Sequence, residues 1–268
     1  MFNWIRKKKQ PAAVKIAPFQ EMLQRQNQIE RITNRGDCYI ADELIVARRN
    51  MSFINDERFS RAYSLGFNSG HILEGHGEVP LDLRWRVHMC CWAATHAAKL
   101  KGDFVECGVN TGIFSLSVCH FLDFNQLDKS FYLFDTYCGI PEKQMSESEH
   151  PFRMMEKELM YEDCYTIAKS NFSEFDRAML VKGEVPDSLT QVDIEAVSYL
   201  SLDMNIAEPE VAALEHFWDK LVSGGIMIFD DYGWNHYREQ YDAINAISKR
   251  FGVMVATLPT GQGILIKP

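Results

Sequence analysis

The sequence predicts an α/β fold built on a doubly wound, mostly parallel sheet, and three observations lead to this prediction. From Gly102 onward, short apolar runs alternate with stretches of helical periodicity. Each run is almost continuously apolar, as in parallel strands that are covered on both faces. The alternation of strand and helix implies right-handed crossovers, with helices on both sides of one sheet. We therefore expect a Rossmann-like, seven-stranded sheet with an antiparallel C-terminal hairpin and a helical N-terminal extension.

The individual elements follow from these runs. The predicted parallel strands are residues 103–108, 130–135, 178–183, 197–203 and 225–231. The helix before the last strand has an apolar face made of Val211, Leu214, Phe217, Trp218 and Leu221. Gly224 and Gly225 are expected to end that helix. The next helix shows the same spacing at Tyr237, Tyr241, Ile244, Ile247 and Phe251. The runs VMVATL and GILIKP, separated by PTGQ, predict the closing hairpin.

The domain organisation is expected to be simple. Residues 1–100 are interpreted as a helical N-terminal extension that is not clearly independent, and residues 101–268 as the Rossmann-like core. We find no internal repeat and no low-complexity linker that would mark a second domain. A chain of 268 residues is long enough to bury a full core.

Composition excludes several classes of protein. A hydrophobic share of 46% and a charged share of 24% are those of an ordinary globular protein. The formal net charge of −9 does not suit nucleic acid, whose phosphates need a basic surface. The sequence contains no apolar run of 18 residues, so we expect no membrane-spanning helix. The seven cysteines are odd in number and lack C-x-x-C spacing, which indicates reduced thiols in a cytoplasmic protein. The sequence allows a homo-oligomer but does not define one.

Polar residues follow every predicted parallel strand. In sheets of this kind, ligands bind at the carboxyl ends of the strands, so these residues are expected to share one rim. One acid at such a place is common, whereas acids at all five strand ends predict a site. The residues are Glu106, Asp135, Gly183, Glu184, Asp203, Asn205, Asp230 and Asp231.

The first strand runs into a glycine turn with the spacing E-x-G-x-x-x-G, given by Glu106, Gly108 and Gly112. Glycine allows a tight turn here, and the helix that follows leaves free N–H donors at its start. A dinucleotide-binding turn needs a glycine where Asn110 stands, because a pyrophosphate must approach that backbone closely. The turn therefore argues against NAD, and a purely structural turn from strand to helix remains the alternative.

Asp135 ends the next strand, 27 residues beyond Gly108. A carboxylate at this strand end can accept hydrogen bonds from both hydroxyls of a ribose. A ribose acid combined with a glycine turn that does not suit a pyrophosphate favours S-adenosylmethionine. The remaining expected cofactor-binding residues are Asn110, Thr111, Thr136, Gly183 and Glu184.

Asp203, Asp230 and Asp231 come from the ends of two neighbouring predicted strands. Carboxylates gathered in one pocket repel one another and raise one another's pKa unless a cation neutralises them. Hard oxygen ligands favour Mg²⁺ or Mn²⁺ over zinc. In the alternative interpretation, Asp230 caps the following helix and Asp231 faces water.

Taken together, these motifs resemble one family. The segments GDFVECGVNTG, FYLFDTYCGIPE, YLSLDMN, ALEHFWDKLVSGGIMIFDDYG and LPTGQGILIK are similar to the macrocin O-methyltransferase (TylF/MycF-like) family of class I methyltransferases. The resemblance covers about residues 85–268. It implies methylation of a sugar hydroxyl with S-adenosylmethionine and Mg²⁺. It also implies metal binding by Asp203, Asp230 and Asp231, and cofactor binding by Glu106, Gly108 and Asp135.

The chain departs from this family at one position. Where better-known members read L-D-x-D, with the second acid as the proposed base, this chain has Asn205. An amide does not take up a proton at neutral pH, so that role is vacant. Asp203 and His236 are the other candidates for a catalytic role, although a histidine in an exposed loop is the plainer interpretation of His236. Residues 142–164 are polar and rich in Met, which predicts either a mobile flap over the substrate or an ordinary surface loop and helix.

The sequence thus predicts an S-adenosylmethionine-dependent, divalent-metal-assisted O-methyltransferase that acts on a hydroxyl of a small molecule, with a sugar or glycoside favoured. Two alternatives stay open at this point. One is a non-catalytic protein that binds the cofactor and metal, which the vacancy at Asn205 allows. The other is a metal-dependent glycosyltransferase, which the glycine turn disfavours.

Overall fold

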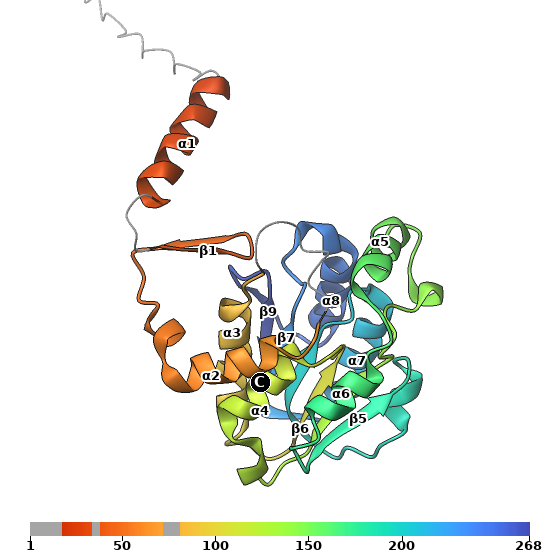
Figure 1. Ribbon diagram of the computed structural model, residues 1–268. Helices are drawn as coiled ribbons and strands as arrows, with labels where there is room; N and C mark the ends of the chain where they lie inside the picture. The colour runs from red at the N-terminus through yellow and green to blue at the C-terminus, as the bar shows by residue number, and fades with distance from the viewer. Residues whose placement is uncertain (1–17, 34–37, 72–80) are drawn as a thin grey trace, which may run out of the picture. The chain divides into compact units, whose positions relative to one another are not determined.

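The computed structural model describes residues 18–33, 38–71 and 81–268 (Figure 1). By its internal contacts the chain divides into two compact units, Met1–Asn50 and Met51–Pro268. The first unit contains helix α1, Pro18–Thr33, and an antiparallel hairpin of β1, Cys38–Ala41, and β2, Leu44–Ala47. The sequence analysis expected only helical and irregular structure here. It missed the hairpin because each strand is only four residues long and gives little periodicity.

The second unit is built on a seven-stranded sheet, which confirms the predicted fold. Its strands are β3 (Asp103–Cys107), β4 (Phe131–Asp135), β5 (Ala178–Lys182), β6 (Val197–Leu202), β7 (Leu221–Phe229), β8 (Ala256–Thr257) and β9 (Gly263–Ile266). The strand order is β5-β4-β3-β6-β7-β9-β8. The strands from β5 to β7 are parallel, and β9 pairs antiparallel with both β7 and β8.

Helices cover both faces of this sheet (Figure 1). They are α2 (Glu57–Phe67), α3 (Arg84–Ala97), α4 (Ile113–Leu122), α5 (His150–Met160), α6 (Tyr165–Asn171), α7 (Ala207–Trp218) and α8 (Arg238–Arg250). Side chains alternate between the two faces along each strand. Phe104 accordingly packs in the core that α2, α3 and α4 share, whereas Val105 packs in the core that α7 and α8 share. Both cores are apolar, which explains the continuous apolar runs.

Two boundaries differ from those expected. Helix α7 ends at Trp218, and Leu221 already belongs to β7. Gly224 and Gly225 lie inside β7, where they exchange backbone hydrogen bonds with Lys267 near the C-terminus. This pairing with a distant segment extends the strand across the glycines. In addition, α2 and α3 belong to the same compact unit as residues 101–268; the sequence analysis described residues 1–100 as an extension that is not clearly independent.

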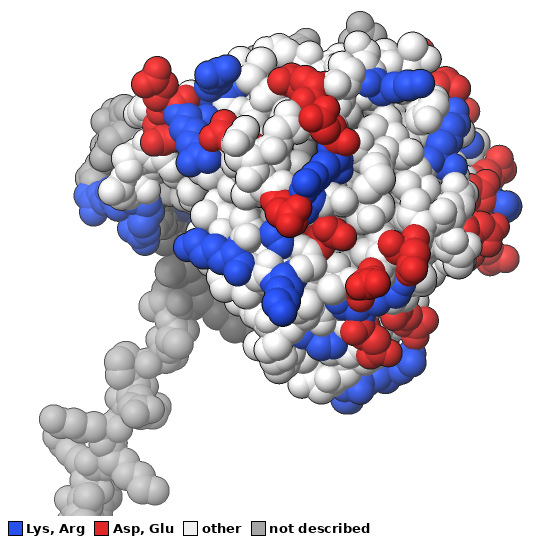
Figure 2. All heavy atoms as spheres, turned by 90° about the horizontal axis from the view of Figure 1, so that it is seen from below, with Lys and Arg blue, Asp and Glu red and all other residues white. Residues whose placement is uncertain are grey.

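The surface of the structure agrees with the charge balance of the sequence. On the face shown in Figure 2, Lys and Arg side chains alternate with Asp and Glu side chains rather than forming one basic stripe. Such a surface does not favour a polyanion. Among the described residues, no helix is long and apolar enough to cross a membrane.

Candidate active site

The candidate site lies where the order of the strands reverses. Strand β3 lies between β4 and β6, so the chain leaves β3 toward one side of the sheet and later returns to its other side. The crevice at such a point is where open α/β sheets bind ligands. It brings together the residues after β3, β4, β6 and β7.

The glycine turn after β3 is required by the packing of the chain itself. Gly108 has φ +90°, and a Cβ atom there would lie 1.8 Å from the carbonyl oxygen of Asp203. Gly112 has φ +106°, and its Cβ atom would lie 2.7 Å from the ring of Phe172. Both values of φ are in the region that glycine adopts without strain. Gly108 thus lets the loops after β3 and β6 touch, and Gly112 leaves room for Phe172 at the end of α6, as the structural interpretation of the motif expected.

Asp135 holds the loop after β3 in place. Its Oδ2 accepts backbone N–H bonds from Val109, at 2.5 Å, and Asn110, at 2.7 Å, and its Oδ1 accepts one from Tyr137 at 2.6 Å. The Thr136 hydroxyl lies 3.3 Å from Oδ1, but its single proton serves the carbonyl of Gly139 at 2.6 Å. A carboxylate has about four acceptor positions. One position on Oδ1 therefore remains for a hydroxyl of a ligand.

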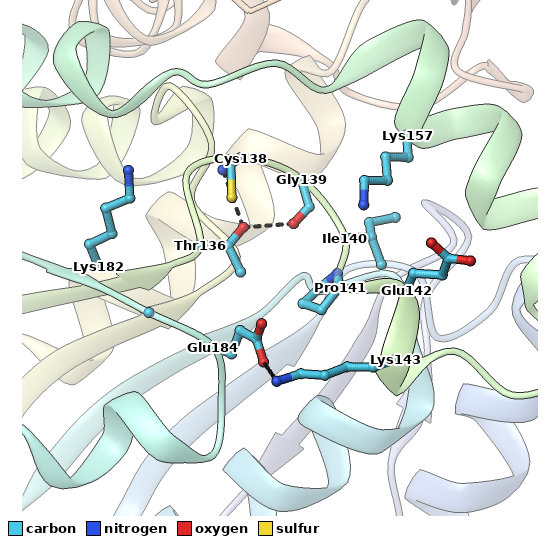
Figure 3. A pocket seen from close by; sticks show the side chains of 11 residues that line it. Thr136, Cys138, Gly139, Ile140, Pro141, Glu142, Lys143, Lys157, Lys182 and Glu184 are labelled. Atoms are coloured by element: carbon cyan, nitrogen blue, oxygen red, sulfur yellow. Dashed lines mark hydrogen bonds and ion pairs between the residues drawn. The ribbon is translucent and has the colours of Figure 1, made fainter.

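A cavity of about 420 Å³ lies at the turn that follows β4 and Asp135, where Thr136, Cys138 and Gly139 form part of its lining (Figure 3). Three of the expected cofactor residues, Thr136, Gly183 and Glu184, line it. Lys143, on the short helix η4 (Glu142–Gln144), forms an ion pair of 2.6 Å with Glu184 across it. The remaining wall includes the apolar side chains of Ile140 and Pro141. The lining thus combines two apolar side chains with five charged ones, which are Glu142, Lys143, Lys157, Lys182 and Glu184.

Glu106 is the second carboxylate of the expected cofactor site, and it is only 2% exposed. Its Oε2 atom has no hydrogen-bond partner among the described residues. Burial, together with the charges of Asp230 and Asp135, raises the pKa of Glu106 to about 8. A buried carboxyl oxygen without a partner is costly, so it needs a donor or a cation from a ligand.

The remaining two expected cofactor residues have structural partners. Asn110 has φ +51°, and its backbone N–H binds Asp135. Thr111 is buried, and its hydroxyl lies 2.8 Å from that of Ser69, which follows α2. The Thr111 hydroxyl is therefore engaged on the side of α2. The cofactor roles of both residues stay predictions.

The three expected metal ligands are close enough to influence one another electrostatically. Burial, followed by the charges of Asp230 and Asp231, raises the pKa of Asp203. Burial and the charge of Asp230 also raise the pKa of Asp231, which Arg86 partly offsets. No described residue donates a hydrogen bond to the side chain of Asp203 or Asp231. Asp203 and Asp231 thus behave as expected of gathered carboxylates whose negative charge is not fully neutralised by nearby positive charge.

Asp230 differs from the other two acids. Arg86, on α3, donates to its Oδ2 at 2.7 Å, and Gln262, beside β9, donates to its Oδ1 at 3.0 Å. Arg86 also lies 3.9 Å from Asp231 and 4.9 Å from the centre of the Trp234 ring. Over residues 18–33, 38–71 and 81–268, no three His, Cys, Asp or Glu side chains are gathered as a ready-made metal site. Metal binding by all three acids therefore stays a prediction.

Asn205 occupies the centre of a hydrogen-bonded group. Its Nδ2 donates to the hydroxyl oxygen of Tyr161 at 3.2 Å, and its Oδ1 lies 3.1 Å from the hydroxyl of Tyr237. His236, by contrast, is exposed, and its ring lies 5.8 Å from that of Phe152, centre to centre. The structure therefore brings Asn205 into the site beside Asp203. A catalytic role for His236 remains only a prediction.

The sequence analysis missed several residues that shape the site. Glu210 is buried in the first turn of α7, and its carboxylate accepts the N–H of Met204 at 3.0 Å and a side-chain bond from Gln240. Burial raises the pKa of Glu210 to about 7. Its only signal in the sequence was the pair Pro209–Glu210 at a helix start. The sequence gave no sign that Arg86, Tyr161, Tyr237 and Gln262 meet at the site, because each reaches it from a distant segment. Tyr237 was instead assigned to the apolar face of a helix, and it lies on the short helix Asn235–Tyr237.

Comparison with known proteins places this geometry in a family. The family model for macrocin-O-methyltransferase (TylF) matches residues 84–250. No curated protein matches the chain in sequence. The solved structure of the O-methyltransferase NovP is 18% identical, with a TM-score of 0.59, and the match covers 68% of this chain and 79% of NovP. CalS11, described as a TDP-rhamnose 3′-O-methyltransferase, is 15% identical with a TM-score of 0.47, covering 94% of this chain and 96% of CalS11.

The likeness to NovP supports the fold, and the family model supports the activity. The family model covers more than half of the chain, including the glycine turn, Asp135, the three acids and α5. The expected resemblance is confirmed, and it decides against the glycosyltransferase alternative. The chain belongs to the macrocin-O-methyltransferase (TylF) family and is an S-adenosylmethionine-dependent O-methyltransferase.

Proposed function

We propose that this methyltransferase transfers a methyl group to a sugar hydroxyl of a small molecule, with the help of a divalent cation held by Asp203 and Asp231. The cation is supported by one observation: Asp231, which is buried, and Asp203, which is half-buried, both have a raised pKa, and their side chains accept no hydrogen bond from a described residue. The sugar is favoured because the resemblance to the TylF family implies it.

The cofactor fits the residues after β3 and β4. The free acceptor position on Asp135 Oδ1 suits a ribose hydroxyl, and the neighbouring cavity suits the adenine. Glu106, buried and with one unpartnered oxygen, suits the ammonium group of the methionine part. A charge-assisted hydrogen bond to that group would supply the missing partner.

The donor chemistry at the acids fits Mg²⁺ or Mn²⁺. Mg²⁺ is commonly held by one or two carboxylates and keeps several waters, so Asp203 and Asp231 suffice as protein ligands. Asp230, bonded to Arg86 and Gln262, would then orient the loop and add negative charge rather than bind the ion directly. This changes the expected set of three ligands to two ligands and one supporting acid. When bound, such a cation would lower the pKa of a coordinated acceptor hydroxyl.

The chain's own residues contribute mainly alignment. The acceptor oxygen attacks the methyl carbon in line, the new O–C bond forms as the S–C bond breaks, and S-adenosylhomocysteine leaves. Asn205 does not accept the hydroxyl proton, so the proton passes to Asp203 or to water. Arg86 limits the repulsion among the three acids and so keeps them together in the absence of substrate.

A methyl-transfer screen tests this proposal. We would incubate the enzyme with S-adenosylmethionine and a panel of glycosides, nucleotide sugars and catechols, with Mg²⁺, with Mn²⁺ and with excess chelator. We expect product from a sugar substrate, loss of product with chelator, and recovery when Mg²⁺ is added back. Full methyl transfer in excess chelator would contradict the proposed requirement for a divalent cation. Methylation of catechols alone would contradict the proposed sugar acceptor.

A further inference from the structure

Helix α5 is amphipathic in the reverse sense. Arg153, on its inner face, is 1% exposed, whereas Phe152, Met155 and Leu159 are 51%, 53% and 54% exposed. A surface helix normally buries its apolar face against the core. Here the buried face is polar, so burial of apolar surface does not by itself hold the helix against the sheet. Polar contacts must do so instead.

These contacts run along the segment 142–161, which we call the lid, and reach the loops after three strands. Gln144 donates to the carbonyl of Val185, after β5, at 2.6 Å. Glu149 accepts the N–H of Ala207, the first residue of α7, at 2.8 Å. This bond caps helix α7, because the side chain of its N-cap residue, Ile206, makes no capping hydrogen bond.

The third set of contacts involves the turn after β7. Arg153 donates to the carbonyl of His236 at 3.1 Å, and its guanidinium lies 3.7 Å from the centre of the Tyr237 ring. Arg153 also pairs with Glu156, whose other oxygen lies 3.3 Å from the Tyr237 hydroxyl. Arg153 and Tyr237 thus bring the inner face of α5 against the short helix η6, Asn235–Tyr237.

Asn205 joins the two sides of this arrangement. Tyr161, at the end of the lid, and Tyr237, on η6, lie on either side of its amide group. The amide offers both a donor group and an acceptor atom, and it adds no charge beside Asp203 and Asp231. A carboxylate at this position could not donate to Tyr161 as the amide does. An asparagine in place of the family's acid therefore suits a residue that connects two side chains better than one that accepts a proton.

We infer that Asn205 is a positioning residue that latches the lid over the acid cluster by joining Tyr161 to Tyr237. The lid then shields the acceptor site from water and opens when these bonds break. This inference deepens the proposed function, because the lid covers the proposed cation and acceptor site. It depends on neither the cation nor the identity of the acceptor.

The structure supplies matched controls for a test. Asn245, on α8, accepts from the Tyr232 hydroxyl at 2.9 Å and donates to the carbonyl of Tyr241 at 2.7 Å. It is half-buried, as Asn205 is. Asn245→Ala and Tyr232→Phe thus remove an equivalent bond between a tyrosine and an asparagine, but away from the lid.

The experiment is amide hydrogen exchange, followed by mass spectrometry, on the full chain without acceptor or added metal. For Asn205→Ala, Tyr161→Phe and Tyr237→Phe we expect about tenfold faster exchange in peptides from the lid, because each loses a bond that keeps the lid closed. Peptides from β3 and β6 should exchange as in the wild type. Asn245→Ala and Tyr232→Phe should leave the lid unchanged. Asn205→Asp, which can still accept from both phenols, should stay within about twofold of the wild type.

Unchanged lid exchange in Asn205→Ala would overturn the inference. So would faster exchange spread equally over β3 and β6, because that result would indicate general destabilisation. If Asn205→Ala does not fold, the two Phe variants and their combination decide. Their effects should be less than additive, since either change breaks the same latch. The screen for methyl transfer can fail independently, so the two proposals are tested separately.

Discussion

The guanidinium of Arg86 donates a hydrogen bond of 2.7 Å to Oδ2 of Asp230, although 144 positions separate the two residues in the chain. The side chain of Arg86 is 13% exposed and that of Asp230 is 5% exposed, so water screens this pair only weakly. The bond connects α3 to the end of β7. It also supplies the only positive charge that the described residues place within 4 Å of Asp230 or Asp231.

We therefore predict that Arg86→Ala lowers the free energy of unfolding by about 3 kcal/mol, because it leaves a buried carboxylate unpaired. Urea denaturation measures this loss. The control is Arg250→Ala, which breaks an exposed ion pair of 3.0 Å with Glu215 and should cost less than about 1 kcal/mol. Equal, small losses in the two variants would show that Asp230 does not depend on Arg86.

Asp231→Asn should remove most methyl transfer, by about a hundredfold or more, because the cation would lose one of its two protein ligands. The measurement is the initial rate at increasing Mg²⁺ concentration. His236→Ala is the control, and its rate should fall less than about threefold, since the His236 ring lies on the exposed side of the turn. A rate in Asp231→Asn that equals the wild type, with the same response to Mg²⁺, would argue against a cation held by this residue.

Asp135→Ala should weaken S-adenosylhomocysteine binding by tenfold or more. The loss of a charge-assisted hydrogen bond to the ribose costs about 1.5 to 3 kcal/mol, and the loop after β3 also loses its anchor. Isothermal titration calorimetry measures the affinity. Asp103→Ala is a matched control, because Asp103 accepts the N–H of Ser130 at 2.8 Å at the opposite end of β3. It should leave the affinity unchanged, and an equal loss in both variants would indicate an indirect effect.

The stability of the free enzyme should fall as the pH rises from about 5 to 8. Burial raises the pKa of Glu106 from 4.5 to about 8, so the folded state keeps a proton that the unfolded state has released. A carboxyl group shifted in this direction stabilises the folded state at low pH, and its contribution decreases by up to about 1.4 kcal/mol per pH unit in this window.

Glu106→Gln should flatten this dependence, although Glu210, whose pKa is about 7, leaves part of it in place, as do Asp203 and Asp231, whose pKa is also raised. Urea denaturation at pH 5, 6, 7 and 8 gives the comparison. Glu208→Gln, at an exposed position in the first turn of α7, should keep the slope of the wild type. An identical slope in Glu106→Gln would mean that Glu106 is already ionised in the free enzyme.

The sequence by itself determined the fold of the second unit and the positions of its strands. Apolar runs such as 197–203 are long, and they bury both faces, so periodicity and turn residues define them locally. It also located the acids of the rim, because the carboxyl ends of parallel strands must share one edge. Asp135 and Asp203 were therefore found without any knowledge of distances.

Only the tertiary structure decided what each of these side chains binds. Arg86 reaches Asp230 from a helix that showed no motif, and Tyr161 and Tyr237 meet at Asn205 from segments 76 positions apart. The extent of β7 likewise depends on its pairing with the C-terminal strand rather than on Gly224 and Gly225. Periodicity reports which face of an element is apolar, whereas a hydrogen bond between distant side chains depends on how the elements are packed. For that reason the family resemblance could only predict a vacant base at Asn205, whereas the folded chain showed its two tyrosine partners.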